Sequence, residues 1–275
     1  MRNKIELTVE AMIAETVKAS RELSHPPKRE LRSSALSHFC QIAFMIPWIE
    51  RKPEDEHFTK DFYCGIGTAV HSSLQKWMGF KSHLYGKWKC PECCKIVKEG
   101  FGPVIHYNTR CNFLCTYEEY DLSWKGLTGH CDGIIIIDNK CYILEFKTIS
   151  LEGLRRHIKT NEPDEFHSNQ VNMYVLMGQK LALPYPLVGA VIVYIARDNP
   201  KKHAAFLKEG VNFRDVQEAL RQYKQAGQMV ASGNFKDVVR RCKNLGDAPF
   251  CAYKSMCFRG NVEEHLAKYW ELYRG

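Results

Sequence analysis

The sequence predicts an α/β protein in which helices flank a mixed central sheet. Its 275 residues, 45 % of them hydrophobic, are enough to build a globular core. A helical pattern at residues 65–80 precedes three strand-like runs, and a second helical pattern near 164–181 is followed by an apolar strand at 187–196. The three strand-like runs lie near 117–124, 127–137 and 140–148. This order of helix and strand favours a sheet covered by helices.

The segments outside this pattern carry weaker signals. The first thirty residues indicate a helical or loosely ordered lead-in, and residues 33–44 are expected to form a helix. A polar loop is expected after the third strand. Helical spacing of apolar residues returns at 211–231.

The two apolar strands that meet at Asp138-Asn139, a hairpin turn signal, are interrupted by charged residues. Asp132 lies on the first strand, whereas Glu145 and Lys147 lie on the second, two apart and therefore on one face. Charged residues at a strand end are usually solvated, but these acids interrupt a buried-looking Ile/Leu run, where a charge without a partner is costly. Two carboxylates and a lysine in such a place can hold a divalent cation next to a phosphate.

Two further motifs flank the hairpin in the sequence. Upstream, Gly67 and Thr68 are followed by His71 on the predicted helix at 65–80. Downstream, Gln170 and Tyr174 are one helical turn apart, so their side chains share a face.

Together these motifs resemble those of the RecB-type nuclease branch of the PD-(D/E)xK superfamily, over roughly residues 34–260. The resemblance implies a restriction-endonuclease-like core and metal-dependent hydrolysis of DNA phosphodiester bonds, with Mg²⁺ or Mn²⁺ as the cation. It implies that Lys147 is the catalytic lysine, and that Gln170 and Tyr174 bind the substrate. The implied metal ligands are His71, Asp132, Glu145 and the backbone carbonyl of Phe146.

The net charge of the chain is compatible with a nucleic-acid partner. The net charge is +8 and the isoelectric point about 8.8, which suits a polyanion without being diagnostic of one.

We find neither a signal peptide nor an apolar run long enough for a membrane span, and therefore expect a cytoplasmic protein, in the host cytoplasm if it is viral. In a reducing compartment, clusters among the 12 cysteines indicate metal sites rather than disulfides.

The first cysteine constellation has the spacing of a zinc ribbon. A C-x2-C pair is followed about twenty residues later by a C-x3-C pair, in a segment, 86–118, with too few apolar residues for its own core. The predicted zinc ligands are Cys90, Cys93, Cys111 and Cys115. Cys94 is a competing ligand, and surface thiols on a loop are the alternative.

The second constellation joins the two ends of the chain. Its members are Cys40, Cys242, Cys251 and Cys257. This set is similar to the four thiolates that hold the 4Fe-4S cluster of CRISPR-associated and phage iron-sulfur single-strand exonucleases. The spacing departs from that pattern because Cys242 stands nine positions before Cys251 and position 248 is alanine, so zinc or plain buried thiols remain alternatives. The remaining cysteines in the core, Cys64, Cys131 and Cys141, are expected to be small buried residues.

These observations predict a nuclease core at 63–235 that contains the insertion at 86–118. A helical region at 1–62 precedes the core, and a cysteine-rich region at 236–275 follows it. An iron-sulfur staple would join the two outer regions.

The predicted function is that of a metal-dependent deoxyribonuclease, an exonuclease on single-stranded DNA or DNA ends. Recombination, repair, phage DNA processing and CRISPR adaptation are the settings that the resemblance implies. The chain has no phosphate-loop motif, so a helicase, recombination or integrase partner would supply any unwinding. The alternatives are a catalytically silent nucleic-acid-binding or assembly module with a nuclease fold, and a nuclease that acts on RNA.

Overall fold

The computed structural model describes residues 57–108, 110–124 and 127–212, together with scattered positions between 12 and 32 and between 214 and 232. The helix predicted at 33–44 lies outside the described residues. So do the four cysteines of the predicted iron-sulfur staple: Cys40, Cys242, Cys251 and Cys257.

The chain divides into two compact units. One comprises residues 1–29, 40–68 and 226–275, and its described part is mainly helical turns at 57–68. The other comprises residues 30–39 and 69–225 and contains the sheets. The domain boundaries inferred from the sequence stay predictions.

The second unit is built on a mixed sheet that has seven strands among the described residues. Its strand order is β12-β11-β10-β9-β2-β3, with β6 also paired to β2. The β10–β11 pair is parallel and the other pairs are antiparallel. The strands are β2 (Tyr85–Lys89), β3 (Ile96–Phe101), β6 (Thr116–Glu118), β9 (Gly133–Ile137), β10 (Lys140–Ile149), β11 (Leu187–Ala196) and β12 (His203–Glu209).

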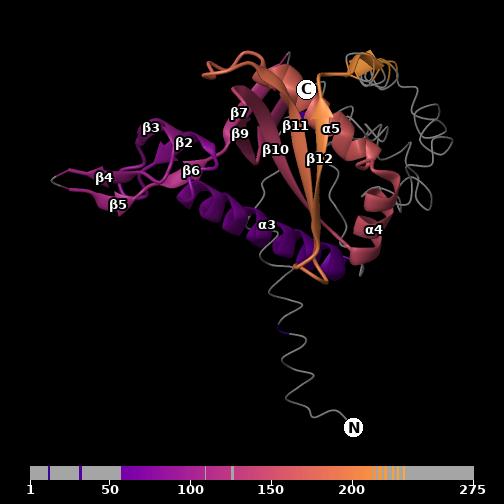
Figure 1. Cartoon of the computed structure of the whole chain (residues 1–275), viewed down its shortest axis with the longest axis horizontal. Coiled ribbons are helices and arrows are strands. Elements are labelled where there is room, and N and C mark those ends of the chain that lie inside the picture. Colours follow the sequence, from indigo (N-terminus) through magenta and orange to yellow (C-terminus); the bar gives the residue numbers. More distant parts are fainter. Residues whose placement is uncertain are drawn as a thin grey trace, which may run out of the picture. The chain divides into compact units, whose positions relative to one another are not determined.

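Two smaller sheets accompany the central one. The first has the order β1-β8-β7, and the second is the pair β4-β5. Figure 1 shows β4 and β5 at the far end of an arm that starts from β2, β3 and β6. The bounds of these strands are β1 (Leu31–Arg32), β4 (Ile105–Tyr107), β5 (Asn112–Leu114), β7 (Tyr120–Trp124) and β8 (Leu127–Cys131).

The hairpin predicted from Asp138-Asn139 is confirmed by the antiparallel pairing of β9 with β10. Asp138 and Asn139 have φ of 49° and 58°, the left-handed values that both central residues of a type I′ turn need. Asparagine and aspartate tolerate this conformation better than most residues, so the local sequence defines where the chain reverses.

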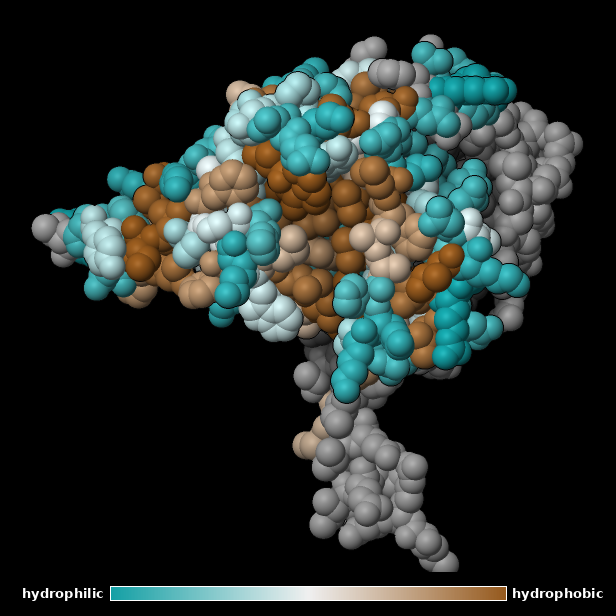
Figure 2. Space-filling view, viewed as in Figure 1, coloured by the Kyte–Doolittle hydropathy of each residue, from teal (hydrophilic) through white to brown (hydrophobic). Residues whose placement is uncertain are grey.

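Helices cover both faces of the central sheet (Figure 1). On one face, helix α3 (His57–Phe80) packs Val70 and Leu74 against a cluster that includes Leu144 of β10. On the opposite face, α4 (Leu151–Thr160) and α5 (Glu165–Gly178) pack against a larger cluster that includes Ile143. Successive side chains of a strand point to opposite faces, so β10 contributes to both clusters. Figure 2 shows apolar surface over the middle of the sheet and along the arm.

Helix α4 corrects the prediction of a polar loop after the third strand. Its start is capped by Ser150, whose hydroxyl accepts a hydrogen bond from the Gly153 N–H at 3.1 Å. Leu154 is buried, and Asn161 ends the helix in a left-handed conformation. The segment was predicted as a loop because most of its residues are polar and only a narrow face of the helix is buried. Strand β12 was also not predicted, whereas the strand at 187–196 is confirmed with its bounds.

None of the helices in the described ranges combines the length and the apolar character needed to cross a membrane.

Candidate active site and cysteine cluster

The first half of the candidate active site joins α3 to the bend between β8 and β9. The Nδ1 atom of His71 lies 3.2 Å from Oδ1 of Asp132, and Oδ2 of Asp132 accepts a hydrogen bond from the Phe146 N–H at 2.6 Å. Asp132 was expected on a strand, but it lies where the chain leaves the three-stranded sheet and enters the central one. The antiparallel pairing of β9 with β10 ends at Gly133 and Leu144, which leaves the Phe146 N–H for the carboxylate.

The second half joins β10 to α5. Oε1 of Glu145 lies 2.6 Å from Nζ of Lys147 and accepts a hydrogen bond from Nε2 of Gln170 at 3.1 Å. The same amide group of Gln170 donates to the Tyr174 hydroxyl at 2.8 Å. Glu145 and Lys147 of the predicted hairpin and two side chains of the helix predicted near 164–181 thus form one hydrogen-bonded cluster.

Glu145 is the most electrostatically perturbed member of this cluster. Only 3 % of the residue is exposed, and this burial raises the pKa of its carboxyl group to about 7, with Asp132 adding to the shift and Lys147 opposing it. Its second oxygen, Oε2, is buried and has no hydrogen-bond partner in the part of the chain that the structure describes. A buried carboxylate oxygen without a partner is costly, and a bound cation would remove that cost.

Two residues that sequence reasoning missed belong to the same site. Nε2 of Gln75 donates to Oε1 of Glu119 at 2.7 Å and to the backbone carbonyl of Asp132 at 2.8 Å. Gln75 is one helical turn after His71 on α3, a spacing that could have indicated it. Glu119 lies between β6 and β7 with no sequence signal. Burial first, and then the negative charge of Glu145, Asp132 and Glu119, raise the pKa of the nearby Cys131 thiol well above its usual value.

The residues present fit a hard divalent cation. Carboxylate and carbonyl oxygens are the donors that Mg²⁺ and Mn²⁺ prefer, and an imidazole is an acceptable further ligand. The site also holds a lysine at a carboxylate, so it combines the capacity to bind a cation with a positive group that can face an anionic substrate.

The cysteine cluster lies on the arm, where the segment between β2 and β3 meets the β4–β5 pair. Four residues each offer one ligand atom, and all four atoms lie within 4.8 Å of one another. The members are Cys90, Cys93, His106 and Cys111. His106 was not predicted, whereas Cys115, which was, is buried beside this group and 4 % exposed. Such a group could hold a metal ion.

The thiols of this cluster have unequal pKa values. Hydrogen bonding by the Cys93 backbone, stronger than the opposing effect of burial, lowers the pKa of Cys90 to about 6. Burial, and contacts with Cys90 and Cys93, raise the pKa of Cys111 to about 11. One sulfur is therefore already favoured as the thiolate, the form that binds metals.

Four other described cysteines, Cys64, Cys94, Cys131 and Cys141, belong to no group of metal-ligand donors among the described residues. Cys131 and Cys141 are fully buried in the main core, as predicted. Cys64 is exposed, so the expectation that it is a buried residue is wrong.

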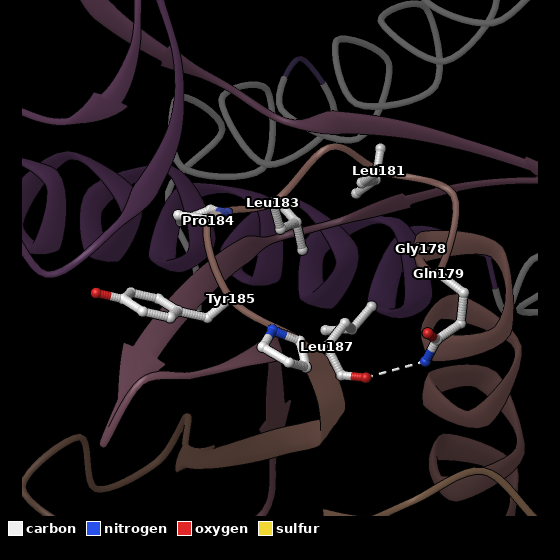
Figure 3. A pocket seen from close by; sticks show the side chains of 8 residues that line it. Gly178, Gln179, Leu181, Leu183, Pro184, Tyr185 and Leu187 are labelled. Carbon is white, nitrogen blue, oxygen red and sulfur yellow. Dashed lines mark hydrogen bonds between the residues drawn. The ribbon is translucent and has the colours of Figure 1, made fainter.

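A separate pocket opens between the end of α5 and the start of β11 (Figure 3). It has a volume of about 310 Å³, and Nε2 of Gln179 donates to the Leu187 carbonyl across it at 2.9 Å. The lining has no acidic, basic, histidine or cysteine side chain. It is formed by Gly178, Gln179, Leu181, Leu183, Pro184, Tyr185, Pro186 and Leu187. This pocket therefore offers no charged side chain that could bind a cation, unlike the carboxylate cluster.

No protein-family model matches the chain, and no curated protein matches its sequence. Among solved structures, that of SSO0001 has a TM-score of 0.48 at 12 % identity, over 92 % of this chain and 97 % of the other.

Two structures of the alkaline exonuclease LHK-Exo are also similar. That of LHK-Exo from Laribacter hongkongensis has a TM-score of 0.30 at 13 % identity, over 43 % of this chain and 64 % of the other. The complex of LHK-Exo with dAMP has a TM-score of 0.43 at 10 % identity, over 79 % of this chain and 95 % of the other. With TM-scores below 0.5, none of these likenesses carries an argument about function, which rests on the chain's own residues.

Proposed function

We propose that the chain is a metal-dependent nuclease that hydrolyses phosphodiester bonds of DNA. The observation that carries the proposal is the convergence of Asp132, Glu145 and Lys147, with one buried oxygen of Glu145 lacking a partner among the described residues. Lys147 and Gln170 compensate the burial of the other oxygen, whereas a purely structural role would leave Oε2 without a partner.

In this proposal the cation is held by His71, Asp132, Glu145 and the backbone carbonyl of Phe146. When bound, Mg²⁺ or Mn²⁺ would supply Lewis-acid stabilisation of the charge that develops on the phosphate. Asp132 is held in place by the Phe146 N–H and by His71, so its orientation does not depend on the substrate. This fixed arrangement limits the reorganisation needed during the reaction.

Lys147 carries the positive charge that would face the scissile phosphate. Its ammonium group contacts Glu145 at 2.6 Å and is only partly exposed, so its position is constrained and its charge is weakly screened. Gln170 fixes Glu145 from the other side and connects it to Tyr174. Both would lie beside the path of the nucleic acid and act as positioning residues.

We further propose that the substrate is single-stranded DNA or DNA ends and that a helicase, recombination or integrase partner provides unwinding. A 4Fe-4S cluster at Cys40, Cys242, Cys251 and Cys257 stays part of this proposal. It predicts a brown protein after anaerobic purification, with iron and sulfide in equal amounts. A colourless preparation would remove the cluster from the proposal and leave the nuclease core unaffected.

The test is cleavage of end-labelled single- and double-stranded oligonucleotides in Mg²⁺ or Mn²⁺, with wild type and Lys147→Ala. Lys140→Ala is the matched control, because Lys140 is an exposed lysine on the same strand. We expect degradation by wild type and by the control, and none by Lys147→Ala. Binding without cleavage by the wild type would identify a catalytically silent nucleic-acid-binding module instead. Cleavage of RNA alone would assign the site to an RNA-directed nuclease.

A further inference from the structure

We propose that the cysteine cluster on the arm is a structural zinc site with three thiolate ligands and one imidazole ligand. The ligands are Cys90, Cys93, His106 and Cys111. Cys115, the fourth ligand that the cysteine spacing favours, stays outside the coordination sphere. The inference is independent of the proposed nuclease activity.

The spacing of the four ligand atoms suits zinc. Zinc bonds of about 2.3 Å to sulfur and about 2.0 Å to nitrogen place the corners of a tetrahedron with three sulfurs and one nitrogen roughly 3.5–3.8 Å apart. The Sγ atom of Cys93 lies 3.7 Å from Nδ1 of His106, and all four ligand atoms lie within 4.8 Å of one another. Shifts of about an ångström would therefore complete the site.

The first two ligands, Cys90 and Cys93, lie on one short segment between β2 and β3. The Cys94 N–H donates to the Cys90 carbonyl and the Cys90 N–H to the Lys95 carbonyl, each at 2.9 Å, which closes a tight turn. Cys94 adopts a left-handed φ of 57° in this turn. These backbone hydrogen bonds hold Cys90 and Cys93 on one short turn.

The other two ligands are held by the β4–β5 pair. His106 lies on β4 opposite Phe113, and Cys111 comes just before β5. The side-chain oxygen of Asn108 accepts hydrogen bonds from the N–H groups of Arg110 and Cys111, both at 2.8 Å, which fixes the connecting loop.

The position of Cys115 argues against its being the fourth ligand. It is buried in the same small cluster as Cys90 and Cys111, and its own N–H donates to the Val104 carbonyl at 2.8 Å. Its sulfur is nevertheless not among the four mutually close donors. We infer that Cys115 packs behind the metal site.

The arm needs such a site because it has little apolar interior. Its buried cluster consists of Trp88 and three cysteines. The large apolar side chains of the outer strands are exposed, namely Ile105, Tyr107, Phe113 and Leu114. Zinc binding would then supply the free energy that fixes β4 and β5 on the rest of the arm.

The experiment measures zinc content and competitive zinc affinity of the full chain, followed by spectra of the cobalt-substituted protein. Cobalt reports ligands directly, because the intensity of its thiolate charge-transfer band grows with the number of sulfur ligands. We expect zinc affinity to fall by at least about tenfold in His106→Ala and to stay at the wild-type value in Cys115→Ala. Cys94→Ala is the control, since Cys94 is an exposed cysteine of the same turn.

A gain-of-ligand variant keeps the test decisive if His106→Ala fails to fold. His106→Cys should retain zinc and raise the cobalt charge-transfer intensity by about one third, from three sulfur ligands to four. Loss of zinc from Cys115→Ala with retention in His106→Ala would overturn the ligand assignment. A wild-type arm that takes up no zinc, or that contains iron, would overturn the site itself.

Discussion

The carboxylate cluster on the central sheet and the cysteine cluster on the arm both have the donors for a metal, but they are built in opposite ways. Asp132 and Glu145 are held by the long strand β10 and by helices α3 and α5, with an apolar core on each side of the sheet. The cysteine cluster is held by short strands and a few turn hydrogen bonds. In the first region the scaffold positions charges at a cost to stability, whereas in the second the metal would supply the stability.

This contrast separates two kinds of metal dependence. Removal of a cation from the sheet site should change activity and leave the fold intact, because the surrounding core does not depend on it. Removal of the metal from the arm should change local structure, because few apolar contacts would replace it.

The largest expected effect is on cleavage by Asp132→Asn. Asparagine can still accept the Phe146 N–H, but it lacks the negative charge, so the single-turnover rate should fall by about 10²–10³-fold at an unchanged melting temperature. The matched control is Asp138→Asn, which makes the same change at the hairpin turn. A rate within about twofold of wild type would show that Asp132 is a structural residue.

Chelation should then distinguish the two regions by amide hydrogen exchange. Stripping zinc should accelerate exchange across residues 90–115 by at least about 10²-fold and leave β10 and β11 protected, because only the arm lacks an apolar core. Equal acceleration in both regions would mean that the arm and the sheet unfold together, and the contrast between them would be lost.

Glu145→Gln should stabilise the metal-free protein. The raised pKa of Glu145 means that the folded state holds this proton more tightly than the unfolded state does, so ionisation costs stability as the pH rises from about 4.5 through about 7. The free energy of unfolding of the variant should exceed that of wild type by up to about 3 kcal/mol above pH 7, at roughly 1.4 kcal/mol per pKa unit. The difference should vanish near pH 4, as denaturant titrations at several pH values would reveal. A pH-independent difference would contradict the ionisation of a buried carboxyl group.

A smaller effect is expected from Gln170→Ala, which removes one hydrogen bond to Glu145 without changing a charge. The cleavage rate should fall by about tenfold, since a hydrogen bond to a charged group contributes roughly 1.5 kcal/mol or more. Gln179→Ala removes an amide at the end of the same helix, whose partner is the Leu187 carbonyl, and should cleave like wild type. Similar losses in both variants would indicate a general effect on α5.

The smallest effect concerns Asn108 and zinc affinity. Its amide nitrogen lies 3.0 Å from Nε2 of His106, and a histidine that binds zinc through Nδ1 carries its proton on Nε2. The amide N–H of Asn108 and the Nε2–H of His106, both hydrogen-bond donors, would then face each other. Asn108→Asp should replace the amide by a carboxylate oxygen that accepts the Nε2–H, while the other oxygen still accepts the two backbone N–H groups of the turn. Zinc binding should therefore tighten by about three- to tenfold. Asn112→Asp on the exposed part of β5 controls for the added charge; equal effects would show that only charge matters.

The sequence predicted those parts of the fold and site that depend on local chemistry. The Asp138-Asn139 turn and the shared face of Glu145 and Lys147 follow from backbone preference and strand periodicity. The partners of these groups depend on tertiary packing. Glu119 meets Gln75 from a distant segment, and no pattern in the sequence joins them.

The same limit applies to the arm and to α4. A single histidine on a short exposed strand gave no periodic signal, although its position five residues before Cys111 is compatible with a metal-ligand pair. In α4, the possible cap at Ser150 and the apolar Leu154 favour a helix, but the polar composition of the segment led to the prediction of a loop. Composition is a poor guide to secondary structure when only a narrow face of an element is buried.

The hydrogen bond from the Phe146 N–H to Asp132 makes the carboxylate the terminator of a β-ladder. Where β9 ends its pairing with β10, a side chain replaces the missing backbone acceptor, much as a capping residue does at a helix end. The gap between two diverging strands is thereby kept open by the group that would bind the cation. Extending the ladder by two pairs, to Cys131 opposite Phe146, would compete for the same N–H and close that gap, so selection for a longer, more regular sheet and selection for a working site would act in opposite directions at this position.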